Sequence, residues 1–422
     1  MKEDFLQFIW KLQLFSSKKL SSTKGESIEV VAQGFQNSDA GPDFKNAKVR
    51  IGKQLWAGNI EIHIKASSWY EHNHHEDQNY DAVILHVVWE EDVAIFDANN
   101  KPLETLVLKS FVSAQHLSNY QRLFNAPKKW INCEQQIQDV SGFKFNHFLE
   151  QLFFERLNRK SNLIFNELDT CGNNWEEVLF RMLLKNFGLK VNGDAFYQLA
   201  KQLDFSIFRK VCSAELPSEA LLFGVAGMLD NESESSYFKE LKNEYHYLQK
   251  KFALQSNALQ TVQFFRLRPA NFPTIRLSQI SQLYLKEAHL FSKIVELENL
   301  DSFYKLFSIK TSNFWQTHYT FDKESKKTAK RLSKSFIDLL IINTVIPIKF
   351  AYFQKIGKPT DALLEMMQQL KPEKNSIVSN FETLKINAPS AFETQSLIQL
   401  KNEYCHKLNC LNCVVGKELL TN

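Results

Sequence analysis

Two acidic residues stand where a small α/β domain can bring them together against a phosphate. Asp43 follows a Gly-Pro pair at the start of one apolar stretch, and Glu61 lies within the next. Carboxylate oxygens are the ligands that Mg²⁺ and Mn²⁺ prefer, and such a cation orients a phosphodiester and its attacking water. A neighbouring base, Lys65 or His63, would stabilise the charge that develops on the phosphorus oxygens. The spacing therefore predicts a metal-dependent nuclease site.

The second acid belongs to a predicted strand with one polar and one apolar face. Alternate residues of a strand point the same way, so Glu61, His63 and Lys65 share a face while three isoleucines fill the other. The apolar run at residues 83–88 contains His86, which is expected to point at the same site. The alternative interpretation is the exposed face of an edge strand with cross-strand salt bridges.

A histidine-rich segment lies between these two strands and contains His72, His74 and Asp77. Neutral imidazoles with a carboxylate bind Zn²⁺, Mn²⁺ or Fe²⁺ well. The segment loosely resembles the His-x-His-x-Asp-His signature of metallo-β-lactamase-type hydrolases. Three roles are open for it: a metal site of its own, a proton donor or base for the Asp43/Glu61 site, or a solvated loop.

Three cysteines stand close together near the end of the sequence, as Cys405-x4-Cys410-x2-Cys413. Thiolates at this spacing indicate a soft-ligand metal site. Cys133 is the favoured fourth ligand and His406 the alternative. Four cysteines suit either Zn²⁺ or a [4Fe-4S] cluster, and spacing alone does not choose between them.

Nucleic acid is the expected partner, although a formal net charge of +4 is too small to predict it alone. Arg266, Arg268 and Arg276 would either contact phosphates or fasten packed segments together. A second basic set is spaced three or four residues apart and predicts a stripe on a helix, for phosphates or for solvation. Its members are Lys323, Lys326, Lys327, Lys330, Arg331 and Lys334.

The elements that position these residues change in type along the chain. Residues 1–115 predict an α/β domain, residues 116–400 an all-helical domain, and residues 401–422 a Cys-rich metal-binding tail that packs on Cys133. The fold class is therefore α+β or α/β, with an N-terminal mixed sheet and a larger all-α part, and the predicted sheet domain resembles that of the restriction endonucleases. In the first domain a helix at 5–12 precedes strands at 27–32, 47–51, 60–65, 83–89, 93–97 and 103–109, with a helix or loop at 67–81.

Helical periodicity governs the rest of the chain. The predicted helices are 148–168, 175–187, 195–205, 221–229, 238–252, 277–298, 333–343 and 360–369. With 422 residues, 44% hydrophobic and 23% charged, the composition is that of an ordinary globular protein. The longest apolar stretch, residues 337–348, is too short to cross a bilayer, so a cytoplasmic protein without a membrane anchor is expected.

The chain as a whole resembles the uncharacterised bacterial proteins grouped as domain-of-unknown-function family 2851. The matching stretches are residues 40–47, 58–63, Trp69 with His72 and His74, 80–81 with 85–88, 266–273 with Arg276, and Cys405, Cys410 and Cys413. This resemblance implies no activity, because none is assigned to that family.

Residues 1–90 are also similar to the PD-(D/E)xK nucleases, whose core has the order helix, three strands, helix, strand. His63 occupies the place where that fold most often carries Lys, and Lys65 would substitute for it. RecB-like and Cas4-like members tie the nuclease domain with four cysteines around an iron-sulfur cluster. Cys133 with the tail is similar to that plan, although the lone cysteine here follows the acidic motif.

The expected function is a metal-dependent phosphodiesterase acting on DNA or RNA. In it Asp43 and Glu61 hold Mg or Mn, and Lys65 or His63 polarises the phosphate, with help from His72, His74 or His86. One alternative is a non-catalytic scaffold that binds nucleic acid or protein through a degenerate nuclease-like core. The other is a metallohydrolase that uses the His72/His74/Asp77 loop.

Overall fold

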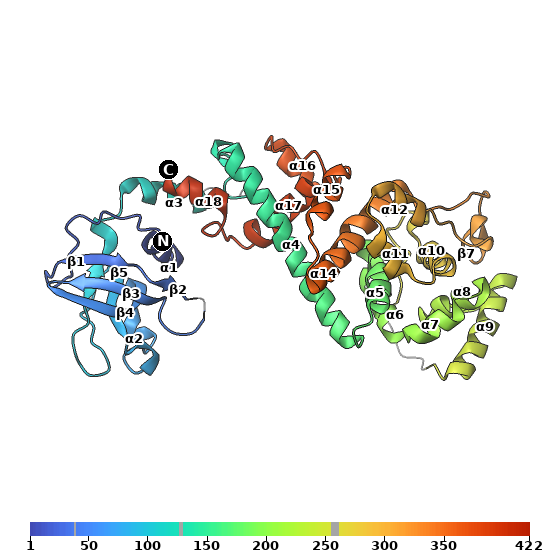
Figure 1. Ribbon diagram of the computed structural model, residues 1–422, viewed down its shortest axis with the longest axis horizontal. Helices are drawn as coiled ribbons and strands as arrows, with labels where there is room; N and C mark the ends of the chain where they lie inside the picture. Colours follow the sequence, from blue (N-terminus) through green and yellow to red (C-terminus); the bar gives the residue numbers. More distant parts are fainter. Residues whose placement is uncertain (38, 126–129, 255–260) are drawn as a thin grey trace. The chain divides into compact units, whose positions relative to one another are not determined.

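The computed structural model describes residues 1–422 apart from residues 38, 126–129 and 255–260, and it divides into two compact units (Figure 1). The first unit comprises Met1–Phe148, Thr383–Ile386 and Ile398–Asn422. The second comprises Leu149–Glu382 and Asn387–Leu397. The first unit holds a mixed sheet, whereas the second is mostly helical, which confirms the prediction of an N-terminal mixed sheet followed by a larger all-α part.

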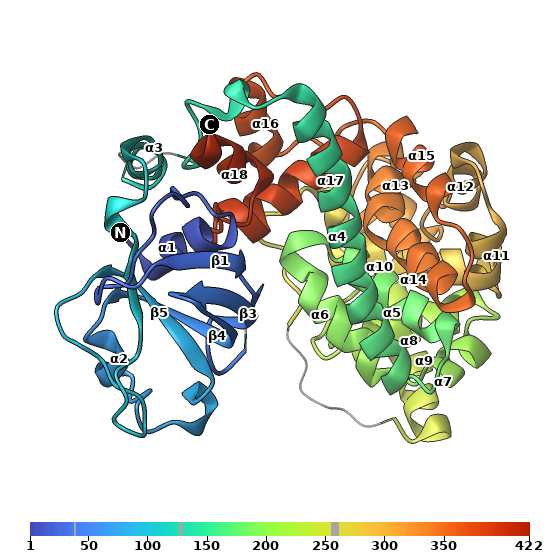
Figure 2. The ribbon, with the colours of Figure 1, turned by 60° about the vertical axis from the view of Figure 1, so that its left-hand side comes forward.

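The sheet of the first unit has the order β1-β3-β4-β5-β6, with β2 beside β3. Figure 2 shows strands β1, β3, β4 and β5 of this sheet. Its strands are β1 (Ile28–Ala32), β2 (Phe35–Gln36), β3 (Phe44–Ile51), β4 (Gln54–Lys65), β5 (Val83–Glu90) and β6 (Thr105–Val107). The pairs from β1 to β4 are antiparallel, and β4, β5 and β6 run parallel. A parallel step needs a crossover, which here contains α2 (Ser68–Glu71) and the short η1 (Gln78–Tyr80).

Two helices pack against β4, the central strand of this sheet. The first, α1 (Glu3–Lys11), buries Phe5, Phe8 and Ile9, and the second, α2, buries Trp69. The order helix, three long strands, helix, strand is the one that the sequence predicts. These helices cover part of β4, so polar residues on that strand, such as Glu61 and His63, are buried.

The predicted strand at residues 93–97 is wrong. Apart from the isolated bridge between Phe96 and Pro102, these residues form no sheet pairing. Both backbone groups of Phe96 bond to aromatic side chains: Trp69 Nε1 donates to Phe96 O at 3.1 Å, and Phe96 N donates to the Tyr70 hydroxyl at 3.1 Å. The segment therefore covers α2 rather than extending the sheet.

The remaining elements of the first unit follow the sheet and end the chain. They are η2 (Leu108–Ser110), α3 (Ala114–Phe124), η3 (Ile137–Asp139), the start of α4 (Gly142–Thr170), the π-helical η7 (Leu400–Cys405) and α18 (Val414–Thr421). The helices α3 and α18 pack together. The C-terminal cysteines therefore belong to the same compact unit as the sheet.

The second unit is built around aromatic side chains, such as the ring pairs Phe180 with Phe208 and Phe223 with Trp315. Its helices are the greater part of α4, then α5 (Trp175–Phe187), α6 (Leu189–Gln202), α7 (Phe205–Val211), α8 (Glu215–Val225), α9 (Ser236–Phe252), α10 (Pro273–Lys286), α11 (Leu290–Glu296), α12 (Leu300–Leu306), α13 (Lys334–Leu340), η6 (Ile341–Val345), α14 (Ile346–Ile356), α15 (Asp361–Gln369), α16 (Ser376–Thr383) and α17 (Ala391–Gln399). The last two extend past the borders of the unit. The helix predicted at 175–187 is confirmed. The one predicted at 277–298 is split, because the extended backbone of Glu287 ends α10.

The predicted basic helix at residues 323–334 is also wrong. Lys323 belongs to β8 (Lys323–Glu324), which pairs with β7 (His318–Thr320), and only Lys334 lies in a helix. Lys330 is buried, and its ammonium donates to the carbonyl oxygens of Trp315 and His318. The segment stays extended because this buried lysine holds the hairpin and the turn before it.

In the described part of the chain, one helix is long and apolar enough to cross a membrane. It runs without a break from Lys334 to Ile356, longer than the apolar stretch seen in the sequence, and 78% of its most apolar window is buried inside the protein. Its Lys349 ammonium donates to the backbone carbonyls of Ile294 and Val295 at 3.1 and 3.0 Å. These contacts are those of a core helix.

Candidate metal centre

A tight turn places Asp43 at the mouth of β3. Gly41 has a φ of +100°, a conformation that favours glycine, and the Asn37 side-chain amide donates to the carbonyl oxygens of Asp39 and Pro42 at 3.0 and 3.1 Å. The backbone N–H of Asp43 then donates to Glu61 Oε2 at 3.1 Å. The turn and the neighbouring strand are therefore joined through the second acid.

The pairing of β4 with β5 places the other polar residues. In the parallel register Glu61 lies opposite His86, and His63 lies opposite Val88. This pairing depends on Gly58, because a Cβ there would lie 2.5 Å from the carbonyl oxygen of Ala82. Gly58 therefore allows the backbones of β4 and β5 to approach each other closely.

The acids and histidines form one network in the described structure. Asp43 accepts hydrogen bonds from Gln7 Nε2 at 2.9 Å and from the backbone N–H of Ile62 at 3.0 Å. Glu61 Oε1 lies 3.3 Å from His74 Nε2 and 3.5 Å from His63 Nε2. On its other side, His63 Nδ1 is 2.8 Å from His86 Nε2, a hydrogen bond whose direction depends on the tautomers.

Burial sets the charge state of this network. Burial raises the pKa of Asp43 to about 7, and the charge of Glu61 adds to this shift. Burial also raises the pKa of Glu61 to about 7. It lowers the pKa of His63 to about 2 and that of His86 to about 3. The imidazoles are therefore neutral at neutral pH, and each has one nitrogen with a lone pair, while the carboxyl groups of Asp43 and Glu61 lie close together. Both properties suit a divalent metal.

Three histidines bring their ligand atoms together at this point. Those of His63, His72 and His74 all lie within 4.8 Å of one another, with His72 exposed and the other two buried. His74 Nε2 is buried and has no hydrogen-bond partner in the described structure, although Glu61 is near. If His63 donates from Nδ1 to His86, its Nε2 is free for a metal, as in most metal-binding histidines.

Aromatic side chains hold the histidine loop in place. The ring of His74 stacks on Tyr80 at 3.7 Å, and Trp69 packs edge-on against His74 at 5.4 Å. Tyr80 itself is affected by the site, because burial and the charges of Glu61 and Asp43 raise its pKa to about 12. The loop between the strands is thus an ordered wall of the site.

Sequence reasoning missed Glu3, an acid that belongs to the same site. Burial and the charges of Asp43 and Glu61 raise its pKa to about 7. Glu3 and Gln7 are four residues apart in α1 and so lie on one face of that helix. The helical periodicity of this segment was visible in the sequence, but nothing in it showed that this face meets the strands.

Two predicted site residues have other surroundings. Asp77 caps η1, where its carboxylate accepts from the backbone N–H of Asn79 at 2.9 Å, and it reaches His74 only through its charge. Lys65 is exposed at the end of β4, and its charge acts on Asp92. Glu61 and His63, rather than Asp77, are the neighbours of His74.

The four cysteines singled out in the sequence line one cavity of about 20 Å³. Its lining is Cys133, Cys405, Cys410 and Cys413 with Leu123, Asn132, Tyr404 and Gly416. Burial raises the pKa of Cys405 to about 12 and of Cys410 to about 11, with smaller contributions from neighbouring thiols. His406, the alternative ligand, is exposed and does not line the cavity.

The arginines that were candidates for phosphate contacts differ from one another. Arg276 is buried, donates to Gln279 Oε1 at 2.8 Å and to Asn271 Oδ1 at 2.6 Å, and stacks on Phe336. It therefore fastens segments of the second unit. Arg266 and Arg268 are exposed, as are Lys326, Lys327 and Arg331.

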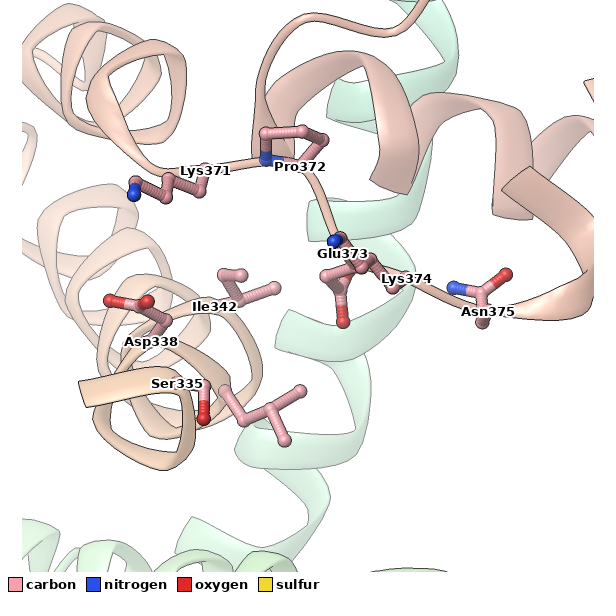
Figure 3. Close-up of a pocket in the computed structure, with 9 residues that line it drawn as sticks. Ser335, Asp338, Ile342, Lys371, Pro372, Glu373, Lys374 and Asn375 are labelled. Atoms are coloured by element: carbon pink, nitrogen blue, oxygen red, sulfur yellow. The ribbon is translucent and has the colours of Figure 1, made fainter. Parts of the chain in front are cut away.

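The second unit has a larger cavity of about 490 Å³ (Figure 3). Ser335, Asp338 and Ile342 line it from α13 and η6, and the segment 371–375 lines it from the opposite side. Its charged residues are of both signs: Asp338 and Glu373 with Lys371 and Lys374. None of the residues singled out in the sequence lines this cavity.

The comparisons with known proteins give a family and nothing further. No curated protein and no solved structure matches the chain. One family does match, over residues 3–376, which is far more than half of the sequence and includes the whole acid and histidine site. The chain therefore belongs to the family described as protein of unknown function (DUF2851).

Proposed function

We propose that the chain is a metal-dependent phosphodiesterase that acts on DNA or RNA. The observation that carries this proposal is the convergence of Asp43 and Glu61 with His63, His72 and His74 at one end of a mixed sheet. Two buried carboxylates beside neutral imidazoles, one with an unpartnered nitrogen, form a set of ligands suited to a divalent cation.

The donor set also indicates which metal fits. Glu61 directs one oxygen towards the Asp43 turn and the other towards His63 and His74, so it would serve both groups. Imidazole ligands favour Zn²⁺ or Fe²⁺ over Mg²⁺, whereas the carboxylates also suit Mn²⁺. When bound, such a metal would supply an activated water and neutralise charge on the phosphate.

The protein residues would supply orientation and proton transfer. Hydrolysis joins a water oxygen to phosphorus, breaks one phosphorus–oxygen ester bond, and delivers a proton to the departing alcohol. In this scheme exposed His72 would handle that proton rather than bind the metal, while buried His86 orients His63 through their hydrogen bond. Asp43, fixed by Gln7 and Ile62, would hold its carboxylate in one direction.

Phosphodiesters are the proposed substrates because the αβββαβ order and the positions of the two acids are similar to those of PD-(D/E)xK nucleases. A second candidate, a metallohydrolase with another substrate, is favoured by the histidine group alone. The two candidates differ in whether a phosphodiester is cut and in whether Asp43 is needed.

A survey of metals and substrates tests the proposal. Purified protein is incubated with Mg²⁺, Mn²⁺ or Zn²⁺ and single-stranded DNA, duplex DNA or RNA, beside Asp43→Asn and the control Glu29→Gln. Glu29 is an exposed acid of the same unit that pairs with Arg50. We expect cleavage that depends on metal and on Asp43 but not on Glu29. Absence of metal-dependent cleavage on all three substrates would contradict the proposal.

A further inference from the structure

Four cysteines from three separate segments of the first unit line a single cavity. Cys133 lies in the turns after α3, Cys405 ends η7, and Cys410 and Cys413 lie in the turn before α18. We propose that these four side chains bind a [4Fe-4S] cluster. This site contains none of the acids or histidines described above, so the proposal is independent of the proposed function.

The surroundings of the thiols are those of a closed ligand set. All four are free thiols; Cys133 and Cys413 are buried and the other two half-buried. Four thiolates are the full complement of a [4Fe-4S] cluster or of a structural zinc ion. The choice between these two depends on how far apart the sulfurs lie.

The spacing of the thiols favours the cluster. A tetrahedral zinc with bonds of about 2.3 Å holds its sulfurs about 3.8 Å from one another. Among the residues that the structure describes, one group of three or more potential ligands has all its ligand atoms within 4.8 Å of one another. That group is His63, His72 and His74. Among the described residues, the four cysteines that line the cavity do not form such a group, so their sulfurs are not all as close together as a single zinc ion would hold them. A four-iron cluster is larger than one ion and needs this wider arrangement.

The start of α18 closes on the cysteine turn. The backbone N–H groups of Val415 and Gly416 bond to Cys413. Gly416 allows the approach, because a Cβ there would lie 2.0 Å from the carbonyl oxygen of Cys410. Backbone N–H groups directed at sulfur stabilise a cluster thiolate and raise the reduction potential of the cluster.

A buried lysine adds positive charge beside the thiols. Lys401 is buried, donates to the backbone carbonyl of Trp130 at 2.6 Å, and stacks over the Trp130 ring. Its charge acts on Cys405. A cluster with four thiolates is negatively charged, so Lys401 offsets part of that charge while it links the segment of Cys133 to that of Cys405.

Metal and sulfide analysis of the wild-type protein tests the proposal without any variant. The protein is purified anaerobically from iron-replete cells, and iron, zinc and acid-labile sulfide are measured per chain. We expect about four irons and about four sulfides, with a broad absorption band near about 400 nm that bleaches on reduction. One zinc per chain without labile sulfide, or protein that holds neither metal even after reconstitution with iron and sulfide, would overturn the proposal.

Two serine variants assign the ligands. Cys133→Ser should lose more than half of the iron and of the absorption band, whereas Cys212→Ser should keep both. Cys212 is a half-buried thiol of the second unit that does not line the cavity. Circular dichroism of each variant controls for misfolding. A folded Cys133→Ser protein with wild-type iron and sulfide would contradict the ligand assignment.

Discussion

Glu61 is the residue on which the candidate centre depends, because its two carboxylate oxygens meet different partners. One accepts from the backbone of Asp43, and the other faces His63 and His74. Sequence alternation was enough to place Glu61 and His63 on one face. It could not show that His74, eleven residues after His63, also lies close to Glu61 Oε1. The position of His74 depends on how Trp69 and Tyr80 pack against it.

The raised pKa of Glu61 predicts a stability difference that depends on pH. A carboxyl whose pKa rises from 4.5 to about 7 on folding favours the folded state below its unfolded pKa, and this contribution is lost as pH rises through about 7. In chelator at pH 8, Glu61→Gln should therefore melt a few degrees above wild type, whereas at pH 4 the two should melt together. Calorimetry at both values checks this. A Glu61→Gln protein that melts below wild type at pH 8 would contradict the charge assignment.

The unpartnered nitrogen of His74 predicts a loss of metal affinity. His74→Phe keeps the ring stack on Tyr80 but removes Nε2, so its affinity for Mn²⁺ or Zn²⁺ should fall at least about 10-fold. Isothermal titration measures this. His75→Phe is the matched control, since His75 packs on Tyr70 in the same loop and lies outside the histidine group. Equal affinities of the two variants would rule out His74 as a ligand.

Strands and helices were predictable where local pattern decides them and not where a distant side chain does. The apolar alternation of β4 and β5 predicted both strands. Residues 93–97 are also mostly apolar, yet the backbone of Phe96 bonds to Trp69 and Tyr70, which no local pattern reveals. Likewise, the basic residues of segment 323–334 have the spacing of a helix, yet the segment is extended because the buried ammonium of Lys330 bonds to the backbone of Trp315 and His318.

Gly58 tests whether the β4–β5 pairing positions the site. An alanine there would press on the carbonyl of Ala82 and on the side chain of Ile84, so Gly58→Ala should lower the free energy of unfolding by about 1–3 kcal/mol. The affinity of this variant for metal should fall as well, because Glu61 follows Gly58 on β4 and His86 follows Ile84 on β5. Urea unfolding and titration measure the two effects. In Gly142→Ala the added methyl meets open space, and this control should match wild type.

At the scale of the whole molecule, the first compact unit contains both the beginning and the end of the described chain. The sequence predicted a Cys-rich tail that packs on Cys133, because three thiolates lack one ligand. That the tail joins the sheet unit depends on contacts between segments about 270 residues apart, such as Lys401 with Trp130, which composition does not encode.

The second unit has its own buried polar junction, which predicts a separate effect on stability. Asn343, in the π-helical η6, accepts from Arg156 Nη2 and Lys160 Nζ, both at 3.0 Å. Asn343→Leu leaves both cations without this acceptor and should cost about 1–3 kcal/mol. Chemical unfolding measures the loss, and metal affinity of the first unit should not change. Unchanged unfolding would show that the junction contributes nothing to stability.

The rate of metal-dependent cleavage by site variants tests the central claim most directly. With Mn²⁺ and the best substrate of the survey, single-turnover rates are compared for wild type, Glu61→Gln, His74→Phe and His75→Phe. If the acids and histidines form one metal centre, the cleavage rates of Glu61→Gln and His74→Phe should each fall at least about 100-fold, whereas His75→Phe should keep the wild-type rate. A wild-type rate in Glu61→Gln would contradict the account.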